Sequence, residues 1–232
     1  LLVASVKASV RIHGEPAHKS RRNRLGLLHQ LIEGLRALKD PLLGMLVFNT
    51  MLTNVFVYPF QTVAIPVILK QMDPVNWRSL TSLVSLGGVL GPLLSNIAAY
   101  HFRDDTYRGL LSGLLFQLVS VSLCIGSVWV SSFPAFTSPS SYAVCLCVLW
   151  VFVVASNNHF TVFFNSIQQR VLPAGQRGRF IANILALFTM SNAGGLWLYG
   201  RAISPGPHLF WNVGLMLMLS IAMRLLIYGA YT

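Results

Sequence analysis

Charged residues are scarce in this sequence, and acidic residues are the scarcest of them. Only 10% of its 232 residues are charged, six of these are Asp or Glu, and 54% of all residues are hydrophobic. A soluble globule needs more polar surface than this composition supplies. Together with a mean hydropathy of +0.63, the composition predicts that lipid is the solvent for most of the chain.

Cysteine is also scarce, and its placement argues against two common uses. Cys124, Cys145 and Cys147 are the only cysteines, and all lie within apolar runs. They suggest neither a disulfide framework nor the spaced ligands of a zinc site. We therefore expect small buried side chains, with no metal and no cofactor.

Positive charge is plentiful by contrast, because 17 Lys and Arg residues give a formal net charge of +11. Seven of them fall between Arg11 and Lys39, and most of the others lie in short gaps between apolar runs, as topology-setting charges do. No basic helix with interleaved aromatic residues is present. The charge thus favours contact with a lipid bilayer, and no nucleic-acid partner is expected.

Six apolar segments are each near or above the ~20 residues that cross a bilayer as a helix. They cover roughly 41–69, 76–101, 107–132, 141–168, 178–203 and 208–230. We predict an all-α integral membrane protein with six transmembrane helices in a bundle over 41–232. Residues 1–10 are interpreted as the end of a preceding transmembrane helix, and 11–40 as a basic cytoplasmic linker.

The end of the linker has helical periodicity. Leu28, Leu31, Leu35 and Leu38 are three or four positions apart among polar residues. This spacing predicts an amphipathic helix that lies along the membrane surface and ends at Asp40-Pro41. Since apolar runs also lie at both ends of the chain, we expect both ends to be cuts through a larger protein.

The gaps between the apolar segments alternate in charge. Two of them carry Arg103 with Arg108, and Arg170 with Arg177 and Arg179, whereas the other three hold mainly Pro, Ser, Gly and aromatic residues. By the positive-inside rule, the two arginine-rich gaps face the cytoplasm with the linker. The expected location is the plasma (inner) membrane, crossed several times.

Two sequence motifs carry a resemblance to a known family. The loop from Ser166 to Phe180 reads SIQQRVLPAGQRGRF. It resembles the loop between the tenth and eleventh helices of the drug and siderophore exporters of the major facilitator superfamily, where Gln and Pro precede Arg-Gly-Arg. The stretch from Leu31 to Leu43, LIEGLRALKDPLL, resembles the stretch before the seventh helix of the same group.

The resemblance implies a fold and a function. The chain would be the C-terminal half of a twelve-helix major facilitator fold, built from two inverted three-helix repeats, and the N-terminal six-helix half would be a missing partner. The implied activity is secondary active export of a bulky organic molecule, drug-like or siderophore-like, by alternating access. The alternative is a six-helix scaffold, or a subunit of a split transporter, that does not transport by itself.

The resemblance also implies a cytoplasmic gate. Its candidate residues lie in the two arginine-rich gaps: Arg103, Asp104, Arg108, Gln168, Pro173, Arg177, Gly178 and Arg179. Arg177 and Arg179 can reach carbonyl groups at neighbouring helix ends, while Gly178 permits backbone contact. Alternatively, these arginines only fix the topology and touch lipid phosphate. The gap around Arg103 departs from the family pattern, and its ion pairs could belong to a solvated turn.

The family architecture places the first helix of each repeat beside the central cavity, here 41–69 and 141–168. Polar and aromatic residues in these helices are the candidates for the substrate path: Asn49, Thr53, Asn54, Phe56, Phe60, Gln61, Asn157, Asn158 and His159. Amides and aromatic rings suit a small-molecule substrate that is bulky and partly polar. The alternatives are hydrogen bonding between helices for Asn157 and Asn158, and a structural donor for His159.

No Asp or Glu lies inside the six segments, so a proton-driven step would need the other half. Arg224 is expected to extend toward the cytoplasm, and Gln117 to be a packing contact. Gly194, Gly195 and Gly200 are expected to let helices approach closely. Since no nucleophile, metal cluster or carboxylate pair lies at membrane depth, an enzyme is not indicated.

Overall fold

The computed structural model describes residues 35–102, 104–130 and 138–231. Within these ranges the chain is helical apart from short turns, and no strand is found. Six helices are long and apolar enough to cross a membrane: Pro41–Met72, Trp77–His101, Thr106–Trp129, Pro139–Val171, Ala174–Ala202 and Leu209–Ala230. The prediction of an all-helical chain with six helices of membrane-spanning length and composition is therefore confirmed for the described residues, with helix ends within a few residues of those predicted.

The first crossing consists of α3 (Pro41–Leu52), two π-helical stretches η2 (Thr53–Val57) and η3 (Phe60–Ala64), and α4 (Ile65–Met72). The wider π turns lie on either side of Pro59, which has no N–H to donate and whose ring crowds the preceding turn. Irregular backbone at membrane depth is tolerated where protein covers it or where it lines a cavity. Each stretch buries an aromatic side chain, Phe56 in η2 and Phe60 in η3.

The predicted amphipathic helix of the linker lies mostly outside the described residues. Its end is visible as a short 3₁₀ turn, η1 (Ala37–Lys39). Asp40 then caps α3, because its carboxylate accepts a hydrogen bond from the backbone N–H of Leu43 at 2.9 Å. Pro41 occupies the first helical position, so α3 begins directly after its capping residue.

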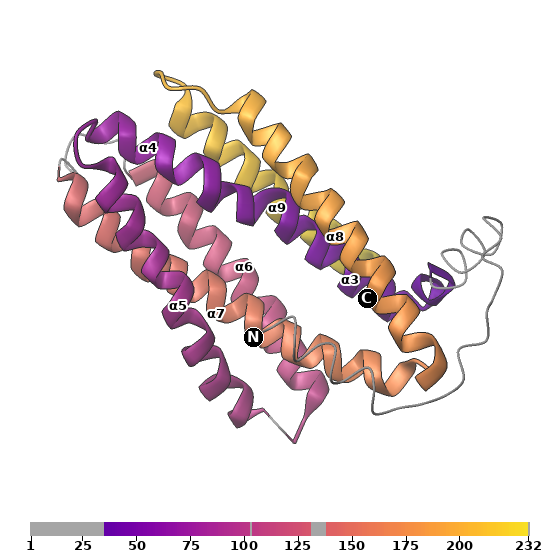
Figure 1. Cartoon of the computed structure of the whole chain (residues 1–232). Helices are drawn as coiled ribbons and strands as arrows, with labels where there is room; N and C mark the ends of the chain where they lie inside the picture. Colours follow the sequence, from indigo (N-terminus) through magenta and orange to yellow (C-terminus); the bar gives the residue numbers. More distant parts are fainter. Residues whose placement is uncertain (1–34, 103, 131–137, 232) are drawn as a thin grey trace, which may run out of the picture.

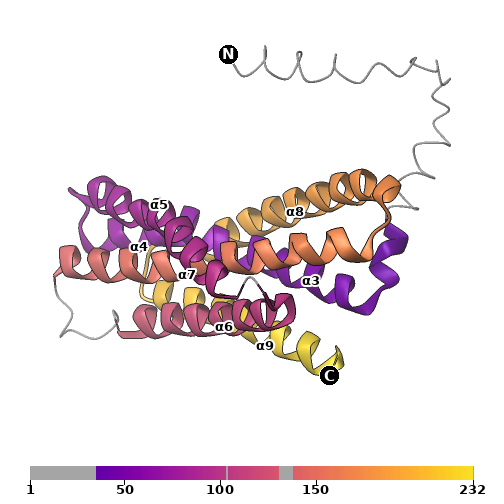
Figure 2. The ribbon, with the colours of Figure 1, turned by 90° about the horizontal axis from the view of Figure 1, so that it is seen from below.

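Two central helices, the first crossing and α7, organise the bundle. The later crossings are α5 (Trp77–His101), α6 (Thr106–Val130), α7 (Pro139–Val171), α8 (Ala174–Ala202) and α9 (Leu209–Tyr231). Helix α7 lies between α5 and α6, whereas the first crossing packs against α8 and α9 (Figure 2). The starts of α5, α7 and α9 lie at one end of the bundle, and the turn between α7 and α8 lies at the other (Figure 1).

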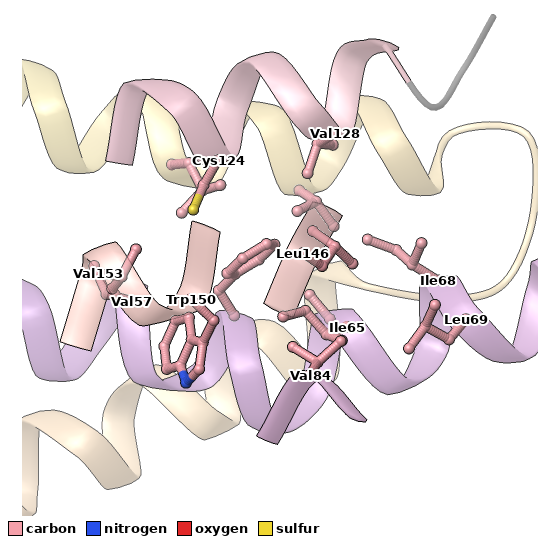
Figure 3. Close-up of a cluster of buried hydrophobic side chains, with 14 of the residues drawn as sticks. Val57, Ile65, Ile68, Leu69, Val84, Cys124, Val128, Leu146, Trp150 and Val153 are labelled. Carbon is pink, nitrogen blue, oxygen red and sulfur yellow. The ribbon is translucent and has the colours of Figure 1, made fainter. Parts of the chain in front are cut away.

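An apolar cluster joins these layers. Trp150 and Leu146 of α7 meet Ile65 of α4, Val84 of α5 and Cys124 of α6 in one buried group (Figure 3). All five side chains are at most 2% exposed. Cys124 is thus buried as predicted. Cys145, however, is exposed on the bundle surface, so the prediction that all three cysteines are buried is wrong.

Glycines allow the helices to approach, but at fewer positions than expected. On α5, a Cβ added to Gly91 would lie 2.6 Å from Cβ of Val154 on α7. On α8, a Cβ on Gly195 would overlap the backbone of Val55 in η2, whereas Gly194 and Gly200 have no neighbour within 4 Å. Of the three glycines highlighted in the fifth crossing, only Gly195 therefore serves close packing.

Candidate functional site

Arg224 lies inside the bundle on α9 with 0% of its side chain exposed. Its Nη1 donates to Oδ1 of Asn49 and, at 2.8 Å, to Oε1 of Gln117. Its Nη2 donates to Oγ1 of Thr53 at 2.6 Å, and its Nε to Oγ of Ser220 at 3.5 Å. The prediction that Arg224 extends toward the cytoplasm is wrong, because these acceptors hold it between the helices.

The hydrogen bonds continue beyond the arginine. Nδ2 of Asn49 donates to Oε1 of Gln117 at 2.9 Å, and Nε2 of Gln117 donates to Oδ1 of Asn157 at 2.7 Å. The hydroxyl of Tyr228 donates to Oδ1 of Asn49 at 2.7 Å. We call these residues, with Arg224, Thr53 and Ser220, the arginine network. Gln117 is a junction of this network and not a simple packing contact, so that expectation is corrected.

The network contains a positive charge and, among its described members, no negative one. All six acidic residues lie outside the six crossings: Glu15, Glu33, Asp40, Asp73, Asp104 and Asp105. An arginine at the centre of a membrane helix costs about 3 kcal/mol on insertion scales. Amide and hydroxyl dipoles offset this cost here, because the network turns four side-chain oxygens toward the guanidinium group.

A cavity of about 680 Å³ lies beside the network, between the first crossing, α7 and α8. Its lining combines amides and hydroxyls with aromatic rings, including Asn54, Tyr58, Asn165, Phe164 and Phe188. Thr53 and Asn157 line the cavity and also belong to the arginine network, so these two residues form the wall between them. Arg177 is the charged residue among the described residues that line the cavity.

A second, water-sized cavity of about 10 Å³ lies on the other side of this wall. It touches Thr53, Gln117, Asn157 and Arg224. A cavity of this volume with several polar neighbours is large enough for about one water molecule. The guanidinium group therefore contacts the wall directly through its hydrogen bond to Thr53, and it also borders the small cavity that Asn157 lines.

The predicted substrate-path residues of the first crossing lie in different environments. Thr53 and Asn54 line the large cavity. Asn49 is buried in the arginine network. Phe56 and Phe60 are at most 4% exposed in the hydrophobic core, and neither they nor the half-buried Gln61 line the cavity. Asn49, Thr53, Phe56 and Phe60 are all buried within the bundle, and of these four only Thr53 also lines the cavity.

Helix α7 separates its three consecutive polar residues in the same way. Only Asn157 lines the large cavity, whereas Asn158 is half-buried outside it. His159 is buried, lies 2.8 Å from Oγ of Ser112, and lines a separate, largely apolar cavity of about 420 Å³ between α5, α6 and α7. Consecutive residues of a helix point in directions about 100° apart, so a cluster in sequence is not a cluster in space.

The turn between α7 and α8 holds the predicted gate residues at the edge of the cavity. Gln168 and Arg177 line it. Nε of Arg177 donates to the carbonyl oxygen of Leu172 at 2.9 Å, and Nη2 donates to that of Gln169. Arg177 thus reaches free carbonyls at the end of α7, as expected.

The neighbours of Arg177 are placed differently. Pro173 is extended and separates α7 from α8. Gly178 and Arg179 are both exposed, and a Cβ on Gly178 would meet nothing within 4 Å. Among the described residues, none approaches Gly178 closely, so its expected backbone contact is not found within this chain.

The other arginine-rich gap forms the turn between α5 and α6. Arg103 lies outside the described residues, and Asp104 lies in the turn. Nε of Arg108 lies 3.2 Å from Oδ2 of Asp105, and the two side chains are 82% and 46% exposed. An exposed pair of this kind contributes about 0–1 kcal/mol, which fits the interpretation of a solvated turn.

Three residues of the site were missed or misjudged from the sequence: Arg224, Gln117 and Tyr228. Arg224 is the only charged residue in 208–230, and Gln117 the only amide in 107–130. A lone polar side chain in an apolar crossing usually faces the bundle interior. That signal was present for both, whereas Tyr228 gave none, since an aromatic ring near a helix end is equally suited to the lipid interface.

The fold and the site together define a class, a multi-pass helical membrane protein with a buried cationic network beside a polar and aromatic cavity. No protein-family model matches the chain, and comparisons with curated proteins and with solved structures gave no match. The likeness to major facilitator exporters therefore rests on the two sequence motifs, from Leu31 and from Ser166.

Proposed function

We propose that the chain is the C-terminal six-helix half of a major facilitator-type secondary transporter, which exports a bulky, partly polar organic molecule by alternating access. The cavity of about 680 Å³ carries this proposal. Its volume lies within the ~300–1,000 Å³ of small-molecule sites. Its lining comes from the first crossing, α7 and α8, and the first crossing and α7 are the two helices that the family architecture places beside the substrate path.

The helix packing supports two repeats. If the first crossing, α5 and α6 form one unit and α7, α8 and α9 the other, then exchanging the units maps the main contacts onto one another. The contact of α5 with α7 corresponds to the contact of α8 with the first crossing. Likewise, the contact of α6 with α7 corresponds to that of α9 with the first crossing. The contact between α6 and α9 is unchanged by the exchange. Units of three crossings necessarily enter the membrane from opposite sides, as inverted repeats do.

The position of the cavity supports access from the arginine-rich side. Its lining extends to Gln169, Leu172 and Arg177 at the turn between α7 and α8. By the positive-inside rule this end faces the cytoplasm of a cell with the protein in its plasma (inner) membrane. A substrate would enter here when the bundle and its partner half are open inward.

Efflux by the full-length native product tests the proposal. We expect this product to have about twice the 25.6 kDa of the chain, and cells that produce it to export fluorescent organic compounds. Asn157→Leu should reduce efflux about fivefold without changing the amount in the membrane, because one hydrogen bond of about 1 kcal/mol is lost at the cavity wall. Asn158→Leu is the matched control and should leave efflux within twofold.

A product of single length that exports nothing, alone or with a second subunit, would contradict the transporter and favour a scaffold. Equal efflux by the Asn157→Leu and Asn158→Leu variants would remove the cavity from the transport path.

A further inference from the structure

The charges around the large cavity have one sign. Arg177 lies at its mouth, and Arg224 lies behind the wall formed by Thr53 and Asn157. No Asp or Glu is among the described residues that line the cavity, and none lies in any of the six crossings. Since no carboxylate offsets the two arginines here, their combined field favours a negative charge in the cavity.

A chain of hydrogen bonds, all donated in the same direction, connects the guanidinium group of Arg224 to the cavity wall. The guanidinium group donates to Oε1 of Gln117 at 2.8 Å, and Nε2 of Gln117 donates to Oδ1 of Asn157 at 2.7 Å. Each bond polarises the next in the same sense. Oδ1 of Asn157 is engaged in this chain, whereas its Nδ2 group has two hydrogens: one can be shared with the Tyr58 hydroxyl and the other can be donated to a molecule in the cavity.

We propose that the cavity binds an organic anion, and that Arg224, acting through Gln117 and Asn157, selects it over neutral and cationic molecules of the same shape. This inference rests on the proposed function and adds the charge of the substrate to it. Arg177 attracts the anion at the mouth, and the Asn157 amide receives the anionic oxygen at the wall. Aromatic lining residues such as Tyr58 and Phe164 contact the apolar body of the molecule.

Arg224 acts here as a positioning residue, since Thr53 and Asn157 stand between it and the cavity. Its effect is therefore a preference for charge and not a direct contact with the substrate. The preference should persist when lysine replaces arginine and should be lost with a neutral side chain.

Binding of two isosteric probes to the full-length native product tests the inference. The probes are 2-naphthoate and its neutral amide, 2-naphthamide, and the protein is held in nanodiscs of phosphatidylcholine, which has no net charge. We expect the carboxylate to bind at least tenfold more tightly than the amide. Arg224→Gln should reduce the preference to less than twofold, and Arg224→Lys should restore at least half of it on a logarithmic scale.

Two further variants keep the test decisive if Arg224→Gln fails to fold. Asn54→Asp places a negative charge on the cavity lining outside the network, and should weaken naphthoate binding at least tenfold more than it weakens naphthamide binding. Arg201→Gln removes an exposed charge near the far end of α8 and should change neither probe. Thermal unfolding of each variant shows that it is folded.

Equal affinity for the two probes in the native protein would overturn the inference, as would naphthoate binding that is unaffected by Asn54→Asp. The outcome is separable from that of the proposed function. Anion-selective binding without any efflux would contradict the proposed transporter and support the anion site. Efflux of neutral or cationic compounds alone would support the transporter and contradict the anion site.

Discussion

The guanidinium group of Arg224 donates to the side-chain oxygen of Gln117 at 2.8 Å, across 107 positions of the sequence. This bond joins α9 to α6 where the Arg224 side chain is fully buried between the helices. A neutral amide is the partner, although carboxylates are the usual partners of buried arginines. The two residues therefore depend on each other, because removing either takes one charge-assisted hydrogen bond from the other in the interior.

This dependence predicts non-additive losses of stability. Gln117→Leu and Arg224→Met should each lower the free energy of unfolding by about 1–3 kcal/mol, since the remaining partner loses the hydrogen bond that joins them. The double variant should lose at least 1 kcal/mol less than the sum of the single losses. Unfolding in mixed micelles measures all three, with the exposed Arg201→Met as control. Strictly additive losses would show that the two side chains do not stabilise one another.

Adjacent glycines on α8 should respond with opposite signs to the same substitution. Gly195→Ala should destabilise by about 1–3 kcal/mol, because the new Cβ would overlap the backbone of Val55, which cannot rotate away. Gly194→Ala has open space around it and should be neutral or stabilise by up to about 1 kcal/mol, because alanine favours the helix. Thermal unfolding of the two variants compares them directly, and an equal loss in both would contradict the packing of α8 on η2.

The turn between α4 and α5 should depend on pH through Asp73. Its carboxylate accepts hydrogen bonds from the backbone N–H groups of Asn76 and Val75 at 3.0 and 3.1 Å, and from Nδ2 of Asn76 at 3.0 Å. The backbone bond from Asn76, followed by its side-chain bond, lowers the pKa of Asp73 below its ordinary value.

A lowered folded-state pKa means that the stabilisation is fully present above the unfolded-state pKa and is lost as the pH falls through the folded-state pKa. Hydrogen exchange at the amides of Val75 and Asn76 should therefore show constant protection above about pH 5, since an unperturbed Asp titrates near 3.9, and reduced protection in more acidic solution. Asp73→Asn should show the reduced protection at every pH. Protection that does not change with pH in the native protein would exclude this role.

The helices could be predicted from the sequence because the bilayer sets their length and excludes charge. Segments such as 208–230 contain a single charged residue, so their limits were clear. Asn54 and Asn157 could also be predicted, since amides stand out in apolar helices. The helices that supply the remaining polar groups lie far away in the chain, however, and Arg224 is seven residues before the end of α9. That position allows either an inward or an interfacial side chain.

The rotation of each helix was the second limit. Lipid is as apolar as the bundle interior, so hydrophobicity does not mark which face of α7 is inside. Asn157, Asn158 and His159 are equally polar by sequence, but only the packing of α5 and α6 against α7 determines which of them faces the cavity. Phe56 and Phe60 failed as cavity residues for the same reason.

The sidedness of the bundle gives a further prediction, which decides whether the cavity is reached from the cytoplasm. Val75 lies in the turn between α4 and α5 and is 84% exposed, and Gln176 is exposed near the start of α8. The two positions belong to opposite ends of the bundle (Figure 1). Gln176 lies among Arg170, Arg177 and Arg179, so the positive-inside rule places it in the cytoplasm and Val75 outside.

Single cysteines at these positions test this, in a full-length product whose native cysteines are replaced by alanine. A membrane-impermeant maleimide should label the Val75→Cys variant in intact cells, and the Gln176→Cys variant only after permeabilisation. The reverse pattern would place the arginine-rich turns outside and open the cavity away from the cytoplasm. Export would then require the substrate to be taken up from the wrong side, so the proposed direction of transport would fail even if the six-helix fold and the anion site remained.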